Sequence, residues 1–186
     1  MLSGDTVIEQ TKKWIIDVVV GCNFCPFAAR EVGRDSIAYV VVDNGTNESG
    51  LEALARAFGS MDTNESVETL LLIFPSAFAG FDAYLRLIHL AEQLLAKQGY
   101  EGMYQLASFH PLYRFAGAPA DDPANYTNRS PHPVLQVLRE DSVTKAIDGY
   151  PNTASIPRHN ISYARKQGLA TMKALREACM QNIQER

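Results

Sequence analysis

Three short, largely apolar runs, the first of them rich in β-branched residues, alternate along this chain with segments of helical spacing, and this alternation limits the fold more than any other feature. The runs cover residues 36–43, 68–74 and 102–109. Each indicates a buried strand because it is nearly continuous in apolar residues and is bounded by turn residues. Strands that alternate with helices predict an α/β domain with an at least partly parallel sheet.

Apolar spacing and capping residues predict the helices. We expect a first helix that Asp5 caps and Gly21 ends, a short helix over 51–58 after turn residues 44–50, and a long helix over 80–98 that Gly99 stops. We further expect a helix from Pro131 that Ser130 caps, a shorter one over roughly 142–149 that Tyr150 and Pro151 break, and a final long helix that Ser155 and Pro157 open and that carries Cys179.

These elements predict one domain over residues 1–186, with a small sheet of three or more strands and a helical C-terminal part. An α+β arrangement stays open. The segment 110–129 lacks a periodic pattern, so a missed strand there is an alternative. An unpatterned stretch of this length inside a compact domain is uncommon and is usually functional when it is ordered.

Composition excludes several classes of protein. Apolar residues at 46% and charged residues at 20% are typical of a globular chain. The formal net charge of −4 argues against a general nucleic-acid binder. We find no apolar run long enough for a membrane helix and no secretory signal. Three cysteines, an odd number, then predict reduced thiols and a cytoplasmic location.

Two residues are candidates for catalysis. His110 directly follows the third predicted strand, and ligands of open α/β sheets bind at the carboxyl ends of strands. Its alternative role is to cap the strand end by bonding to backbone. Cys25 precedes Pro26, which suits the first position of a helix, so the thiol is expected at a helix N-cap that stabilises a thiolate. The alternative for Cys25 is a small core residue.

A polar cluster at 121–131 is the candidate binding site. Ser130 is expected at a helix N-terminus, where free N–H groups attract anions, and Arg129 and Arg139 offer guanidinium groups for a carboxylate or phosphate. Asn125, Asn128 and Tyr126 belong to the same segment and would position the ligand or line a pocket. The alternative is a well-made loop with a helix cap. No nucleotide-binding glycine motif is present.

Several strings in this sequence resemble the bacterial domain-of-unknown-function 1415 family. They are GCNFCPFA (21–28), SFHPLYRFAG (108–117), DDPANYTNRSPHPVLQVLRE (121–140) and RHNI (158–161). The resemblance runs through nearly the whole chain. Cys22 stands where the family pattern has leucine, which weakens a CxxC metal or redox site. His132 and His159 also depart from the pattern.

The resemblance favours Cys25 with His110, and the asparagine–arginine cluster, because Arg129, Ser130, Arg139 and Asn160 match the pattern. It implies no activity. Our leading hypothesis is a cytoplasmic protein with a site for an anionic small molecule, with His110 as general acid or base and Cys25 as nucleophile. One alternative is a non-enzymatic adaptor that presents tyrosines and arginines. Another is a metalloprotein that uses Cys25 and His110. The sequence specifies no cofactor and no oligomeric state.

Overall fold

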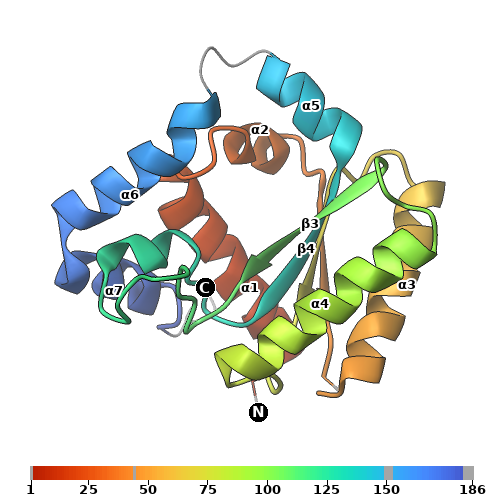
Figure 1. Cartoon of the computed structure of the whole chain (residues 1–186), viewed down its shortest axis with the longest axis horizontal. Helices are drawn as coiled ribbons and strands as arrows, with labels where there is room; N and C mark the ends of the chain where they lie inside the picture. Colours follow the sequence, from red (N-terminus) through yellow and green to blue (C-terminus); the bar gives the residue numbers. More distant parts are fainter. Residues whose placement is uncertain (1, 44, 149–152, 182–186) are drawn as a thin grey trace.

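The structure is a computed structural model that describes residues 2–43, 45–148 and 153–181. A four-stranded sheet lies between two layers of helices (Figure 1). The strands are β1 (Ile37–Val41), β2 (Thr69–Ile73), β3 (Tyr104–Phe109) and β4 (Val134–Arg139). Helices α3 (Asn47–Thr63) and α4 (Phe81–Lys97) cover one face. The other layer contains α1 (Gly4–Trp14), a π-helical segment η1 (Ile15–Val20), α2 (Ala28–Gly33), α6 (Ile156–Gln167) and α7 (Leu169–Ala178).

The order of strands across the sheet is β1-β2-β4-β3. Strands β1 and β2 are parallel, whereas β4 is antiparallel to both of its neighbours. The predicted α/β class, the partly parallel sheet and the helical C-terminal part are therefore confirmed. The three predicted strands correspond to β1, β2 and β3, each with slightly narrower bounds.

The helix predicted from Pro131 is wrong, because this part of the chain forms strand β4. Val134, Leu135 and Leu138 satisfy helical spacing, but alternation along VLQVL satisfies a strand equally well. Leu135 and Val137 face the α3–α4 layer, and Gln136 faces the other layer. Strand pairing favours the strand over the helix, because β4 pairs with β2 on one side and with β3 on the other. The missed strand thus lies after the 110–130 segment.

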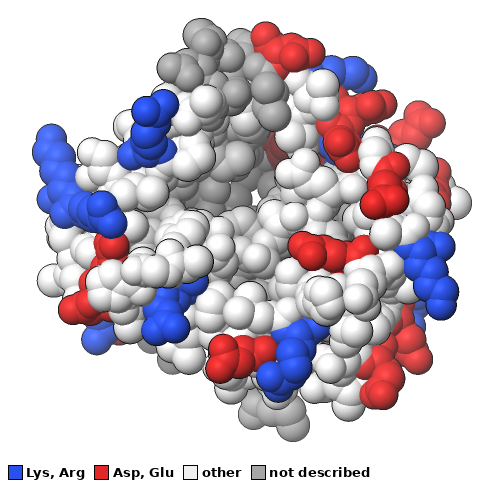
Figure 2. Space-filling view, viewed as in Figure 1, with Lys and Arg blue, Asp and Glu red and all other residues white. Residues whose placement is uncertain are grey.

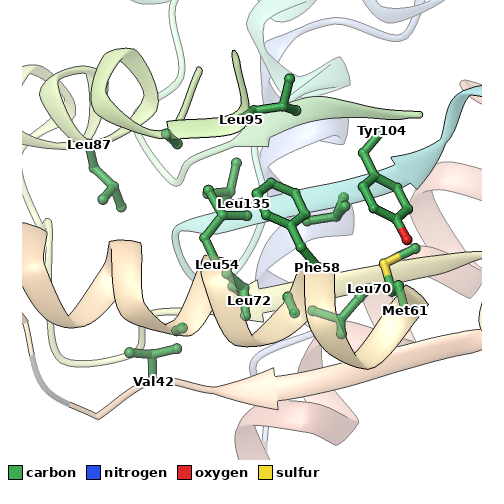
Figure 3. Close-up of a cluster of buried hydrophobic side chains, with 14 of the residues drawn as sticks. Val42, Leu54, Phe58, Met61, Leu70, Leu72, Leu87, Leu95, Tyr104 and Leu135 are labelled. Carbon is green, nitrogen blue, oxygen red and sulfur yellow. The ribbon is translucent and has the colours of Figure 1, made fainter. Parts of the chain in front are cut away.

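The α3–α4 face of the sheet is closed by a continuous apolar core. Phe58 of α3, Leu72 of β2 and Leu135 of β4 are fully buried there, and Figure 3 shows how they interlock. The ring of Phe58 stacks on Tyr104 at 5.5 Å between centroids. Such interdigitation is typical of a core packed to the density of an organic crystal.

The opposite face carries a second core, on which α1, η1, α6 and α7 pack. Trp14 and Val18 lie against Ile73 and Phe109 of the sheet, with Met172 of α7 beside them. The Trp14 and Phe109 rings meet edge to face, with their centroids 5.1 Å apart.

The first helix differs from its prediction in its cap and in its C-terminal half. Ser3, not Asp5, is the N-cap, and its side chain accepts a hydrogen bond from the Thr6 backbone N–H. From Ile15 onwards the helix widens into the π form, and the Gly21 N–H bonds to the Ile16 carbonyl. A Cβ at Gly21 would lie 2.3 Å from the Asp17 carbonyl oxygen, so only glycine fits this turn.

Cys25 does not cap a helix. Helix α2 begins at Ala28 with Phe27 in the cap position, so the expectation of a thiol at a helix N-terminus is wrong. Pro26 and Phe27 instead form a turn after Cys25, which the hydrogen bond from the Ala28 N–H to the Cys25 carbonyl closes.

Three further helices differ in extent. Helix α3 is longer than predicted because Thr46 and Ser49 form a capping box before the apolar stripe begins. The final helix is broken at Gly168, whose φ of 82° suits glycine, and so becomes α6 and α7. Helix α5 (Glu140–Asp148) begins directly after β4. Short 3₁₀ turns cover η2 (Pro123–Thr127) and η3 (Thr153–Ser155).

The turn residue Asn44, residue 149 and the predicted helix break at Tyr150 and Pro151 lie outside the described residues. Within the described part of the chain, no helix combines the length and the apolar character needed to cross a membrane.

Candidate functional site

A cavity of about 330 Å³ lies over the sheet face opposite α3 and α4. It is lined by residues of α1, η1, the turn before α2, all of the described strands, α5 and α6. The lining residues include Trp14, Cys25, Arg30, Glu31, Glu68, Thr69, Leu71, Gln105, Ala107, Phe109, Asn128, Gln136, Arg139, Ser142 and Asn160. Its volume falls within the range of small-molecule sites.

Strand β3 forms one side of the cavity floor. Gln105, Ala107 and Phe109 lie two residues apart and therefore project from the same face of the sheet. From Gln105 to Phe109 the strand extends about 13 Å at 3.3 Å per residue. The small Ala107 side chain between them leaves room above the middle of β3, the edge strand of the sheet.

Cys25 reaches the cavity through the turn that follows η1. Phe24 is buried and packs edge to face on Tyr163 of α6, with centroids 5.7 Å apart, which anchors the turn. Cys25 is half-buried and lines the cavity. Neither of the other two cysteines does so. Burial raises the pKa of Cys22, against the hydrogen bond to Tyr163, and burial raises the pKa of Cys179 to about 11.

A hydrogen-bond network crosses the floor between β2 and β4. The Thr69 hydroxyl donates to the Val137 carbonyl at 2.8 Å. The Gln136 amide nitrogen donates to the Thr69 hydroxyl oxygen at 2.9 Å. On the α6 side, the Asn160 amide nitrogen donates to the Phe24 carbonyl at 2.7 Å. The Asn160 Oδ1 atom is buried and has no hydrogen-bond partner in the described structure.

Carboxylates line the end of the cavity near α2 and α5. Glu31 accepts from Arg30 Nε at 2.6 Å and from the Ser36 hydroxyl at 2.7 Å. Burial alone would raise the pKa of Glu31, but these hydrogen bonds outweigh it and hold the pKa below its ordinary value. Glu68 accepts from the Ser142 hydroxyl at 2.5 Å, and within the described residues it forms no ion pair.

Arg139 lines the cavity, but its guanidinium group is bound elsewhere. It donates to the carbonyls of Met61, Asn64 and Val67, at distances of 2.5 to 3.0 Å. Its Cζ atom also lies 5.8 Å from the ring centroid of Tyr104, a residue of the α3–α4 core. These bonds connect the end of β4 to the α3–β2 loop, and they account for Arg139 without a bound anion.

His110 is buried at the end of β3, on the side of α4. Its ring lies near those of Phe81 and Tyr84, at 5.2 and 5.0 Å between centroids. Nδ1 accepts from the Leu112 N–H at 2.9 Å, so Nε2 carries the proton and donates to the Phe78 carbonyl at 2.7 Å. Burial, opposed by that hydrogen bond, lowers the pKa of His110.

The four histidines are all described, and none lines the cavity. The structure therefore does not place His110 in the cavity with Cys25. The backbone bonds of His110 correspond to the alternative role considered from the sequence, that of a strand-end cap. No group of three His, Cys, Asp or Glu side chains within the described residues is arranged to hold a metal ion.

The polar segment 121–131 bonds mainly to itself and to its surroundings. Arg129 is 8% exposed, donates to the carbonyls of Tyr113 and Ala120, and lies over the Tyr126 ring at 4.6 Å. Asn125 is fully buried, and its amide accepts from the Phe115 N–H and donates to the Pro119 carbonyl.

Two other residues of that segment have different positions. Ser130 does not lie at a helix N-terminus, because β4 follows it, and its hydroxyl donates to the His132 carbonyl. Asn128 reaches the cavity, so it joins Cys25 and Arg139 among the predicted residues that line it. His110, Asn125, Tyr126, Arg129 and Ser130 lie outside the lining.

Sequence reasoning did not single out Glu31, Glu68, Thr69, Gln136 or Ser142 as site residues. They come from separate elements, and no short motif joins them. The one available signal is polar residues at inward positions of strands, as with Thr69 and Gln136 on a face that is otherwise apolar.

Comparison with known proteins identifies a family to which the sequence is similar. A family model described as "Protein of unknown function (DUF1415)" matches residues 6–174 of the 186-residue chain. No curated protein and no solved structure matches the chain. The matched region contains every cavity residue named above.

Proposed function

The chain belongs to the DUF1415 family of proteins of unknown function, and we propose that it binds an apolar small molecule in the cavity over the sheet. The observation that carries this proposal is the cavity itself, of about 330 Å³ beside an otherwise closed core. The cavity is partly open to solvent, because Arg30 and Gln105 of its lining are exposed, so a ligand can enter it. A space of this size, with a few polar groups around apolar walls, fits a ligand site.

Apolar side chains supply most of the binding free energy in such a site. Ile37, Phe109 and Leu138 line the cavity and are only half-buried, so a ligand in contact with them removes apolar surface from water on both sides. Polar groups at the edges then fix the orientation of the ligand.

Cys25 is the reactive group that borders the proposed ligand. A thiolate is the nucleophilic form of cysteine, and it needs a base or a positive environment to form at neutral pH. No histidine lines the cavity, so the geometry favours binding over a cysteine–histidine reaction. The cytoplasmic location remains part of the proposal, supported by three free thiols.

The test uses N-phenyl-1-naphthylamine, a neutral apolar dye whose fluorescence rises on transfer out of water. We expect it to bind the wild-type protein and to accept energy from Trp14, the only tryptophan. Ala107→Phe, which fills the middle of the cavity, should abolish binding. Ala170→Phe, on an exposed position of α7, is the matched control and should leave binding unchanged.

Retained folding of Ala107→Phe is checked by circular dichroism and by cooperative urea unfolding. Equal dye binding by wild type and by a folded Ala107→Phe variant would contradict the proposal, because the dye would then lie elsewhere. Slower alkylation of Cys25 by iodoacetamide in the presence of the dye provides an independent readout at the same cavity.

A further inference from the structure

We propose that the ligand's polar end donates hydrogen bonds, and that an apolar primary amine fits the cavity best. This inference rests on the proposed function and specifies the class of ligand. It departs from the sequence hypothesis of an anion. Several hydrogen-bond acceptors around the cavity are left unused by the protein itself. A ligand that donates to them is favoured, because a buried polar group without a partner is costly.

The floor network leaves an acceptor free. Thr69 uses its only hydroxyl proton on the Val137 carbonyl, so its oxygen must accept from Gln136. The Gln136 atom that faces Thr69 is therefore the amide nitrogen. The amide oxygen, Oε1, has no hydrogen-bond partner within the described structure, and Gln136 is only half-buried.

A second acceptor lies on the α6 side. The Phe24 carbonyl accepts from the Asn160 side chain, which assigns the nitrogen of that amide to the bonded position. Oδ1 is the atom left without a partner, and it is buried. An unsatisfied buried acceptor is costly. Because the Oδ1 atom is closed off from the cavity as well as from solvent, a ligand donor reaches it only if the Asn160 side chain shifts.

Glu68 provides the third acceptor, and within the described residues its carboxylate forms no ion pair. The Ser142 hydroxyl donates to its Oε2 atom, and no hydrogen bond to Oε1 occurs in the described part of the chain. Helix α5 adds Glu140 and Asp141 in its first turn. Figure 2 shows acidic side chains over α5 and on the α3–α4 side of this view, with basic side chains interspersed among them, and further basic ones over α6.

The two arginines that line the cavity already bond to other groups of the protein. Arg30 pairs with Glu31, and the Arg139 guanidinium bonds to three carbonyls. A carboxylate or phosphate in the cavity would meet Glu68 without a free positive partner and would lose its own hydration. A protonated amine instead gains a charge-assisted hydrogen bond at Glu68. Charge complementarity thus selects the amine.

The experiment compares three ligands of one shape: 1-naphthylmethylamine, 1-naphthalenemethanol and 1-naphthoate. Binding to the isotope-labelled full chain is followed by shifts of backbone amide signals at pH 7. We expect the amine to bind at least about tenfold more tightly than the naphthoate, the effect of one charge-assisted hydrogen bond, with the alcohol between them.

Glu68→Gln should remove the preference for the amine over the alcohol and leave alcohol binding unchanged. Glu101→Gln, an exposed carboxylate outside the cavity lining, is the matched control and should preserve the order. Naphthoate binding at the cavity as tightly as the amine would overturn this inference while leaving the proposed function standing. Failure of all three ligands to shift any cavity signal would contradict the proposed function itself.

Discussion

The two faces of the sheet are covered by helices of different length, and only one face is closed. Helices α3 and α4 each have 17 residues and cover their face with a continuous core. On the other face α1 continues into η1 as one long helix, but the rest of the cover consists of shorter elements, among them the six-residue α2. Long helices present complete apolar stripes to a sheet. Short elements that meet at turns leave a gap over β3 and β4, and the cavity occupies it.

The prediction with the largest expected effect compares the loss of unfolding free energy when two adjacent leucines of β2 are truncated. Leu72 belongs to the closed core, whereas Leu71 lines the cavity. Leu72→Ala should cost about 3–5 kcal/mol of unfolding free energy, because it opens a new void in packed surroundings. Leu71→Ala should cost about 2–3 kcal/mol, because Leu71 is almost fully buried but lines the cavity, so its truncation enlarges an existing space and opens no new one. Urea unfolding of both variants measures the difference, and equal costs would mean that the faces are packed alike.

The second prediction enlarges one side chain on each face of the sheet, where the first truncates one. Ala91 of α4 is fully buried in the closed core, so Ala91→Leu should destabilise by about 1–3 kcal/mol through overpacking. Ala107→Leu, on the cavity floor, should be neutral or stabilise by up to about 1 kcal/mol. Thermal unfolding of the two variants decides the point. A destabilised Ala107→Leu variant would show that the space over β3 is smaller than the structure indicates.

The third prediction concerns pH, because a buried histidine lies on each side of the sheet. His110 lies against α4, and His132 donates to Gln10 Oε1 of α1 at 2.7 Å. Burial is the largest cause that lowers the pKa of each below the ordinary 6.5. The unfolded chain therefore binds more protons just below pH 6.5. Stability should be complete above that value and should fall as the solution is acidified toward pH 5.

Urea midpoints measured between pH 5 and pH 8 test this dependence. His110→Gln and His132→Gln should each flatten the acid side of the profile, even if the variants are less stable at pH 8. His159→Gln, at an exposed position of α6, should leave the profile unchanged. A wild-type midpoint that stays constant from pH 7 to pH 5 would refute the expected linkage.

The fold could be predicted from sequence where local pattern and tertiary environment agree. The apolar runs of β1 and β2 and the amphipathic helix α4 are such cases, although β1 is only half-buried. Strand β4 could not be predicted in this way, because its VLQVL run fits both periods and its partners are distant in the chain. The break at Gly168 is a second case, since an isolated glycine inside a helical stripe is often tolerated.

The candidate site was harder to predict than the fold for a physical reason. Polar motifs in one segment suggested a site at 110–131. In the structure, the side chains of Arg129 and Asn125 form hydrogen bonds with the backbone of that same segment. The cavity depends on volume left between elements, which no residue pattern encodes. Cys25, Asn128 and Arg139 are the predicted residues that reach it.

The smallest expected effect tests an ion pair that secures the cavity-side layer. Asp122, at the start of η2, is 8% exposed and accepts two hydrogen bonds from Arg165 of α6, at 2.7 and 3.1 Å. The hydrogen bond from Arg165 is the main cause that lowers the pKa of Asp122. Arg165→Gln should lower the free energy of unfolding only slightly, because the arginine is largely exposed and water screens the pair.

The matched control is Arg56→Gln, which breaks the fully surface pair with Glu52 on α3. It should change stability by less than about 0.5 kcal/mol, since both partners are exposed and belong to one helix. The Asp122 contribution should be present above pH 4 and should be lost as Asp122 is protonated at lower pH. Equal effects of the two substitutions in urea unfolding would show that η2 and α6 need no ion pair to stay packed. Apolar contacts alone would then hold the cavity-side layer together.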